Sequence, residues 1–160
     1  MRTAVRVVAA TLSIALLSTP RAVTAQTTAA SGAPDSLGAV TFAPTLHVDL
    51  ARSVRLASGV YRRDLQRGRG DSVRTLATLT LRMRVRLPDG AVVAADARPT
   101  TRRWLPGTYL PGVEQGLRGL RAGGRRQIVV PAALTYGDRA VPGVPARTPL
   151  VVEVELLGVS

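Results

Sequence analysis

The chain has 160 residues, 46% of them hydrophobic and 20% charged, with a formal net charge of +12. The absence of cysteine excludes disulfides, thiolate metal sites and cysteine nucleophiles, and the single histidine, His47, argues against a histidine-rich metal centre or a Ser-His-Asp triad. Aromatic residues make up only 3% of the chain, which argues against a base-stacking platform for single-stranded nucleic acid.

The basic residues are all arginine, and they are scattered along the chain instead of forming one run. We interpret them as a solvated basic surface and expect no specific nucleic-acid partner. Adsorption of a basic domain to anionic polymers of a cell envelope is one functional alternative, although no motif supports it.

Residues 1–25 have the pattern of a secretory signal peptide. Arg2 and Arg6 precede an almost wholly apolar stretch over residues 7–18, and Val-Thr-Ala at residues 23–25 offers small residues before Gln26. The apolar stretch is shorter than the ~20 residues that span a bilayer as a helix. We therefore predict cleavage near Ala25, export to the periplasm or the medium, and no transmembrane segment in the mature chain.

Residues 26–47 begin with a small, polar sequence that contains Pro and Gly, and are predicted to form a flexible leader. Residues 46–56 suit either a short strand or a helical turn, and residues 59–65 suit an entering strand. From Leu79 to Leu87 apolar residues alternate with Thr and Arg, which predicts a strand with one buried and one solvated face. Asp89-Gly90 then predicts a tight hairpin turn into a second strand over residues 91–95.

Residues 98–111 are predicted to be a loop. Val113, Leu117 and Leu120 fall on one face of a short helix that runs to about Arg121 and is terminated by Gly123-Gly124. Strands are predicted over residues 125–130 and 150–159, with a loop over 132–147. The sequence therefore predicts an α+β fold in which a curved antiparallel β-sheet wraps around one short α-helix.

Most motifs of conventional enzymes are missing. The sequence has no P-loop, no His-Glu-x-x-His, no Gly-x-Ser-x-Gly and no Asp-rich calcium loop. We expect no cofactor and no metal. Any activity would have to use a shaped, mostly apolar pocket with little acid–base chemistry.

Several ordered motifs resemble FKBP-type peptidyl-prolyl cis–trans isomerases, here of an exported bacterial type. The helix segment carries the family's pattern at Gly112, Gly116-Leu117, Gly119, Gly123 and Arg126. Pro131, Leu134 and Tyr136-Gly137 match the next motif, and Pro145, Leu150 and residues 154–157 match the last. Ser58-Gly59-Val60-Tyr61 and the hairpin over residues 79–96 resemble the upstream motifs. The resemblance covers one domain over residues 48–160, with its core at 72–160.

The resemblance implies an isomerase that assists the folding of exported proteins by acting on their proline-containing segments. It assigns the catalytic hydrogen bonds to the Tyr136 hydroxyl and to the backbone N–H of Leu110. Tyr136 could instead be an ordinary core or loop aromatic. The implied substrate-binding residues are Met83, Val93, Asp96, Trp104, Tyr109, Val113, Val144 and Val152.

Several of these positions depart from the family's aromatic pocket. The helix-start tryptophan is Val113, the hairpin tyrosine is Met83 and the final-strand phenylalanine is Val152. The family's Phe-Asp pair falls on Val93-Ala94, or on Ala95-Asp96 if the hairpin is two residues longer, and Trp104 and Tyr109 would restore some aromatic surface. A weak or inactive FKBP-like module that binds peptides as a chaperone is therefore the alternative function.

Overall fold

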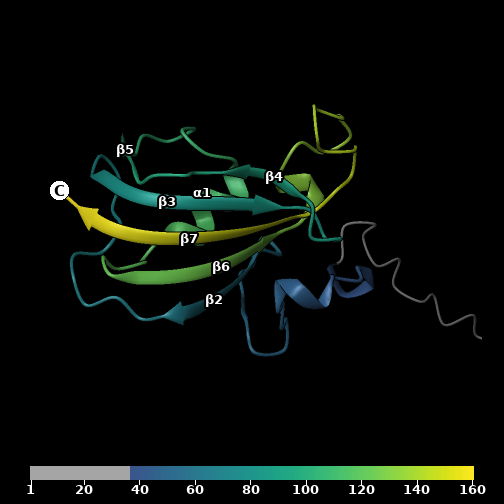
Figure 1. Ribbon diagram of the computed structural model, residues 1–160, viewed down its shortest axis with the longest axis horizontal. Helices are drawn as coiled ribbons and strands as arrows, with labels where there is room; N and C mark the ends of the chain where they lie inside the picture. The colour runs from purple at the N-terminus through teal and green to yellow at the C-terminus, as the bar shows by residue number, and fades with distance from the viewer. Residues whose placement is uncertain (1–36) are drawn as a thin grey trace, which may run out of the picture. The chain divides into compact units, whose positions relative to one another are not determined.

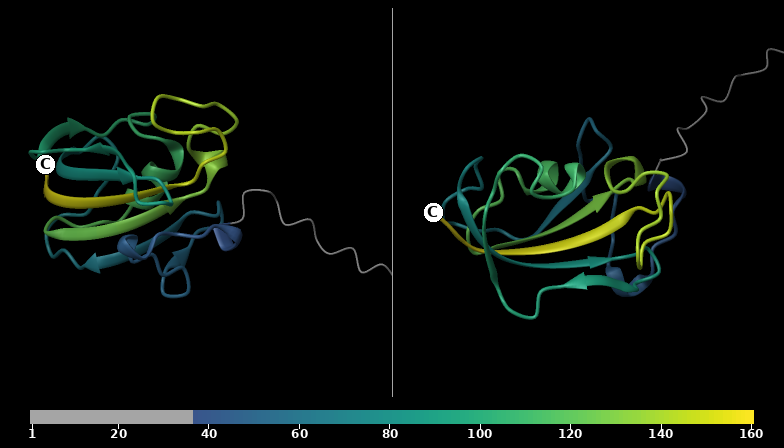
Figure 2. Two further views of the ribbon diagram at one scale, coloured as in Figure 1. Left: turned by 45° about the vertical axis from the view of Figure 1, so that its right-hand side comes forward. Right: turned by 90° about the horizontal axis from the view of Figure 1, so that it is seen from above.

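One antiparallel sheet organises residues 37–160, which are the residues that the computed structural model describes; the predicted signal peptide lies outside them (Figure 1). Its strand order is β1-β2-β6-β7-β3-β4, and β5 pairs with β3. The strands are β1 Val54–Arg55, β2 Tyr61–Gln66, β3 Thr78–Arg86, β4 Val92–Ala95, β5 Thr100–Arg103, β6 Gly124–Val130 and β7 Leu150–Val159. With the helix α1, Pro111–Leu117, packed on one face, this confirms the predicted α+β architecture (Figure 2).

Strand β3 lies between β7 on one side and β4 and β5 on the other. Its pairing with β7 runs from Leu79↔Val159 to Arg86↔Val151. Leu79 and Leu81 are buried on the inner face, towards α1, whereas Arg82 and Arg84 are exposed on the outer face. The predicted alternating strand and its hairpin with residues 92–95 are confirmed.

Helix α1 packs closely on β6 because glycine faces the strand. Pro111 occupies its first turn, as the fixed φ of proline favours. A Cβ placed on Gly116 would lie 2.5 Å from Cγ2 of Ile128, so this position has no room for a side chain.

The helix ends at Leu117, earlier than the predicted end near Arg121. Arg126 of β6 is 5% exposed and donates hydrogen bonds to the carbonyl groups of Gly116, at 2.8 Å, and Arg118, at 3.0 Å. These carbonyls therefore have a partner without another helical turn. Gly119 then takes a φ of +73° and turns the chain away.

The region predicted to be a loop over residues 98–111 contains β5. Thr100–Arg103 pairs with β3 in the register Leu81↔Thr100 to Thr78↔Arg103. The sequence did not predict this strand because Thr-Thr-Arg-Arg does not alternate between apolar and polar residues. The strand forms nonetheless because it pairs with the edge of β3.

The described part of the predicted flexible leader packs against the sheet. Short 3-10 helices span Leu37–Ala39 and Pro44–Leu46, and Leu37 and Leu46 are 4% and 1% exposed. They form a second apolar cluster with Val129 of β6 and Val151 of β7. Residues 37–47 are therefore part of the folded unit, because two leucines among the small residues cover the apolar portion of the outer face.

Residues 46–56, for which two structures were left open, contain the end of the second 3-10 helix and the two-residue strand β1. Within residues 37–160, no helix has the length and apolar character needed to cross a membrane.

Candidate functional site

A cavity of about 220 Å³ opens on the inner side of the sheet, where β4 and β5 pair with one edge of β3. It is lined by Leu81, Met83, Val85, Ala94, Ala95, Asp96, Thr100, Arg102 and Tyr109. The lining of the cavity changes from apolar at one end to polar at the other, as the strand register shows. Val85 lies opposite Ala94 at an apolar end, whereas Leu81 lies opposite Thr100 and beside Arg102 at a polar end.

Asp96 is fixed against the middle of β3. Its Oδ2 accepts a hydrogen bond from the Met83 N–H at 3.0 Å, and its own N–H donates to the Met83 carbonyl at 2.9 Å. This pairing places Ala95-Asp96, rather than Val93-Ala94, beside Met83. Val93 packs on the main core and is not among the residues that line the cavity.

Tyr109 enters the cavity from the loop that precedes α1. Its hydroxyl is buried and has no hydrogen-bond partner within residues 37–160. Burial raises the pKa of this hydroxyl above its usual value, the Arg102 guanidinium opposes that rise and the Asp96 carboxylate adds to it. The Tyr109 hydroxyl therefore stays protonated at neutral pH.

Leu110 is the residue immediately before α1. Its carbonyl accepts the Glu114 N–H at 3.0 Å, whereas its own N–H donates to no group within the described part of the chain. An unpaired backbone donor at the start of a helix can bind a carbonyl oxygen of a ligand.

Tyr136 lies outside the set of residues that line the cavity. It follows the 3-10 helix Ala132–Leu134 and packs, half-buried, against the main core. Its carbonyl accepts the Arg139 N–H at 3.1 Å.

The remaining predicted site residues are Trp104, Val113, Val144 and Val152, which are 4%, 3%, 2% and 0% exposed and belong to the main core. Trp104 extends the β5 pairing, because its N–H donates to the Ala77 carbonyl at 2.8 Å. Its indole therefore packs in the core, and Tyr109 supplies the aromatic surface of the cavity.

Three of the predicted residues, Met83, Asp96 and Tyr109, thus line the cavity together. Arg102 and Thr100 also line the cavity and were not among the site residues predicted from the sequence. The signal that would have identified them is the register of β5, which the sequence pattern does not reveal. Among residues 37–160, no group of three or more His, Asp or Glu side chains is placed to hold a metal ion.

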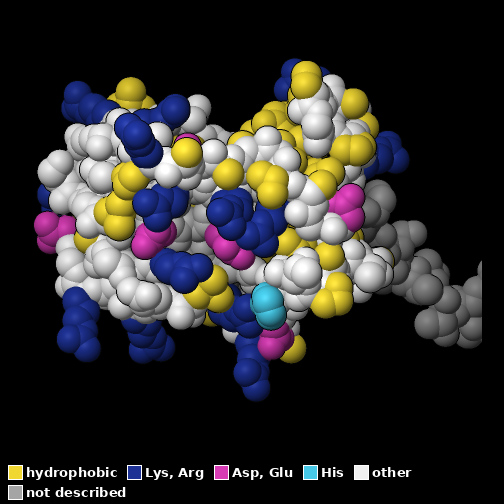
Figure 3. Space-filling view, in the orientation of Figure 1, with side chains coloured by type: hydrophobic (Ala, Val, Ile, Leu, Met, Phe, Trp, Pro, Cys, Tyr) yellow, Lys and Arg dark blue, Asp and Glu magenta, His cyan; other side chains and the backbone are white. Residues whose placement is uncertain are grey.

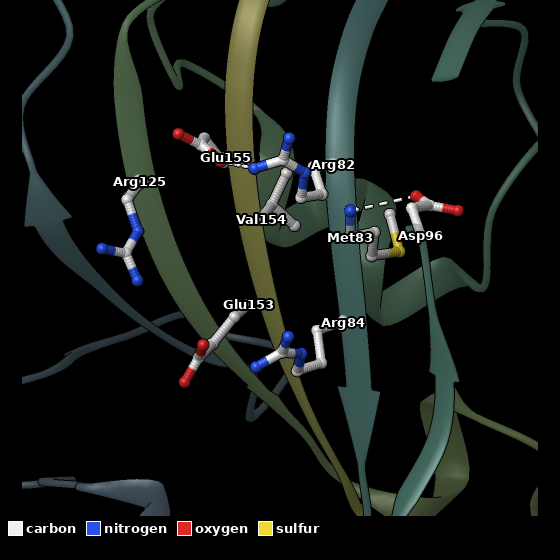
Figure 4. Close-up of a pocket in the computed structure, with 8 residues that line it drawn as sticks. All are labelled: Arg82, Met83, Arg84, Asp96, Arg125, Glu153, Val154 and Glu155. Carbon is white, nitrogen blue, oxygen red and sulfur yellow. Dashed lines mark hydrogen bonds and ion pairs between the residues drawn. The ribbon is translucent and has the colours of Figure 1, made fainter. Parts of the chain in front are cut away.

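A second hollow, of about 300 Å³, lies on the outer face over β3, β7 and β6 (Figure 4). Arg82 pairs with Glu155 at 3.1 Å, and Arg84 and Glu153 face each other across β3 and β7. Basic and acidic side chains alternate over this face, as Figure 3 shows. Opposite charges on adjacent strands are what a solvated sheet face carries, so this hollow does not indicate a site by itself.

The sequence model of a protein family, described as FKBP-type peptidyl-prolyl cis-trans isomerase, matches residues 70–157. Among curated proteins, FK506-binding protein 4 of Chaetomium thermophilum is 36% identical over 109 residues, which cover 67% of this chain and 23% of that protein. The chain therefore spans about a quarter of the length of that relative.

Two solved structures resemble the fold. The peptidyl-prolyl cis-trans isomerase of Pseudomonas syringae pv. tomato aligns with a TM-score of 0.62 at 27% identity and covers 68% of this chain and 81% of its own. FkpA from Escherichia coli aligns with a TM-score of 0.63 at 28% identity, over 68% of this chain and 52% of its own.

Proposed function

The chain belongs to the FKBP-type peptidyl-prolyl cis-trans isomerase family, and from this membership we propose that it accelerates rotation about peptide bonds that precede proline. The observation that carries the proposal is the cavity of about 220 Å³, which combines an apolar end with polar groups. Tyr109 lines that cavity. Leu110, the next residue along the chain, has an unpaired backbone N–H.

The reaction requires no covalent step. A planar peptide bond must twist out of conjugation, against a barrier of ~18–20 kcal/mol. Met83 and Val85 would hold the proline ring at the apolar end of the cavity. The Leu110 N–H would bind a carbonyl oxygen of the substrate, and it favours rotation to the extent that this bond is stronger in the twisted state than in the planar one.

Two tyrosines compete for the role of the second donor. The family resemblance assigns it to Tyr136, which, like Leu110, is not among the residues that line the cavity. Tyr109 itself lines the cavity, and its buried hydroxyl lacks a partner within residues 37–160. We propose that Tyr109 contributes at least part of the polar contact that the family places at Tyr136.

The proposed substrates are segments of exported proteins, and the proposed role is to assist their folding in the periplasm or outside the cell. The support for this compartment is the signal-peptide pattern of residues 1–25.

A module that binds proline-containing peptides without turning them over is the second candidate. The aliphatic character of Met83 and Val85 favours it, because aromatic walls would supply more contact area and specific ring geometry.

The test is the cis-to-trans rate of short proline peptides in the presence of residues 26–160, with Tyr109→Phe, Tyr136→Phe and Tyr61→Phe compared at equal fold content. Acceleration that scales with protein concentration and is lost in one or both of the first two variants would support the isomerase. Tyr61 lies in β2 beside the second apolar cluster and serves as the control. Peptide binding without acceleration would leave the binding module.

A further inference from the structure

Arg102 lies on the core-side face of β5, at the edge of the sheet, and is exposed. It lies directly across from Leu79, which is 0% exposed, and paired residues of an antiparallel sheet share a face. The neighbouring Arg103 therefore faces outwards. An arginine is an unexpected residue on the face that carries the core, and here it forms part of the wall of the cavity.

Arg102 has no carboxylate partner within residues 37–160. The ion pairs of this region join other arginines to their acids. Asp96, the one acid that lines the cavity, already uses Oδ2 to bind the Met83 N–H. The guanidinium of Arg102 also acts on the buried Tyr109 hydroxyl, whose pKa it lowers against the effect of burial.

We propose that Arg102 makes the cavity select proline segments that carry an acidic side chain next to the proline. This inference rests on the proposed function. A proline ring held against Met83 and Val85 places the adjoining part of the substrate along β3, towards Thr100 and Arg102. An acidic side chain there gives Arg102 the partner that the protein itself does not supply.

An inward-pointing charge on an edge strand can also serve only to prevent pairing with another chain. That role makes no distinction between acidic and neutral substrates. Substrate preference therefore separates the two explanations.

The experiment uses peptides blocked at both ends, so that no terminal carboxylate contributes. Glu, Gln or Lys stands before the proline in one series and after it in another, and both kcat/KM and Kd are measured. We expect a preference for Glu over Gln of about two- to fivefold, within the range of an exposed ion pair. The preference should lie in KM and Kd rather than kcat, because the ion pair forms with planar and twisted substrate alike.

The variants separate Arg102 from the general basic charge of the protein. Arg102→Gln should reduce the Glu/Gln ratio to about one, and Arg102→Glu should shift the preference to Lys. Arg103→Gln removes the same charge from the next residue of β5 and should leave the ratio unchanged. Raising the salt concentration should weaken the preference in the unmodified protein.

These measurements test the acidic specificity and the isomerase activity separately. Isomerase activity without a preference for Glu at either position, or a preference that Arg103→Gln removes equally, would overturn the inference and leave the proposed function intact. Absence of catalysis together with tighter, Arg102-dependent binding of Glu peptides would overturn the isomerase and retain the acidic specificity.

Discussion

Glu114 and Tyr109 are joined by a hydrogen bond of 3.2 Å from the Tyr109 N–H to Oε1 of Glu114. The same oxygen accepts the Gly107 N–H at 2.8 Å. The Glu114 carboxylate, in the first turn of α1, therefore fixes the loop that carries Tyr109. This loop leads directly into Leu110, whose N–H is unpaired within residues 37–160.

Glu114→Ala should loosen this loop. We expect a loss of about 1–3 kcal/mol in the free energy of unfolding, because two backbone donors lose a charged acceptor. The isomerase rate should also fall, because Tyr109 and Leu110 lose their fixed position. Urea unfolding and peptide kinetics measure the two effects. Glu114→Gln keeps an acceptor oxygen and should recover much of both, and a rate unchanged in Glu114→Ala would contradict the positioning role.

The raised pKa of Tyr109 predicts a loss of stability at alkaline pH. Above the ordinary value of 10.0 the hydroxyl ionises in the unfolded chain while the folded protein keeps the proton. The folded state then binds more protons, so the free energy of unfolding falls as pH rises through this window. Tyr109→Phe should flatten the fall, as measured by chemical unfolding between pH 8 and about pH 11.

At pH 7, Tyr109→Phe should be at least as stable as the unmodified protein. The hydroxyl that it removes is buried without a partner, and leaving such a group unsatisfied costs about 1–3 kcal/mol. Tyr61→Phe keeps Tyr109 in place and should retain the alkaline fall. Marked destabilisation by Tyr109→Phe at pH 7 would show that its hydroxyl has a partner in solution.

Gly116→Ala should destabilise the fold by about 1–3 kcal/mol, as overpacking of a core does. The added Cβ would lie 2.5 Å from Ile128 in the contact between α1 and β6. Gly38→Ala is the matched control, since a Cβ at Gly38 meets nothing within 4 Å. Thermal unfolding of the two variants checks the difference, and partial rescue of Gly116→Ala by Ile128→Val would locate the clash.

Leu46→Ala should cost about 2–5 kcal/mol, the usual range for a buried leucine. Leu46 is 1% exposed and covers the outer face of the sheet together with Leu37. Leu65→Ala serves as the control because Leu65 is 41% exposed on β2. Equal stability of the two variants would show that residues 37–47 contribute nothing to the fold.

The elements that could be predicted from the sequence are those whose own residues carry a pattern: alternation in β3, an apolar run in β6 and helical spacing in α1. β3 alternates along its length and β7 does so over residues 152–156, and Asp89-Gly90 marks the hairpin. β5 could not be predicted, because its formation depends on an edge of β3 and not on its own residues.

The cavity was predictable only in part for a related reason. The family resemblance identified Met83 and offered Asp96 as one of two alternatives, whereas the contribution of Arg102 depends on a strand register that motif spacing does not contain. Trp104 and Tyr109 lie in one segment of chain, and only the folded backbone shows that the first enters the core and the second the cavity.

The packing of Leu37 and Leu46 also determines where this domain can be divided. The family match begins at residue 70, yet the apolar strip formed by Val129 and Val151 is closed by residues far upstream of that point. A fragment cut at the edge of the homology would expose this strip and would be prone to self-association. Recombinant expression or grafting onto another protein should therefore begin before Leu37, because we expect the smallest independently folding unit to extend upstream of the family match.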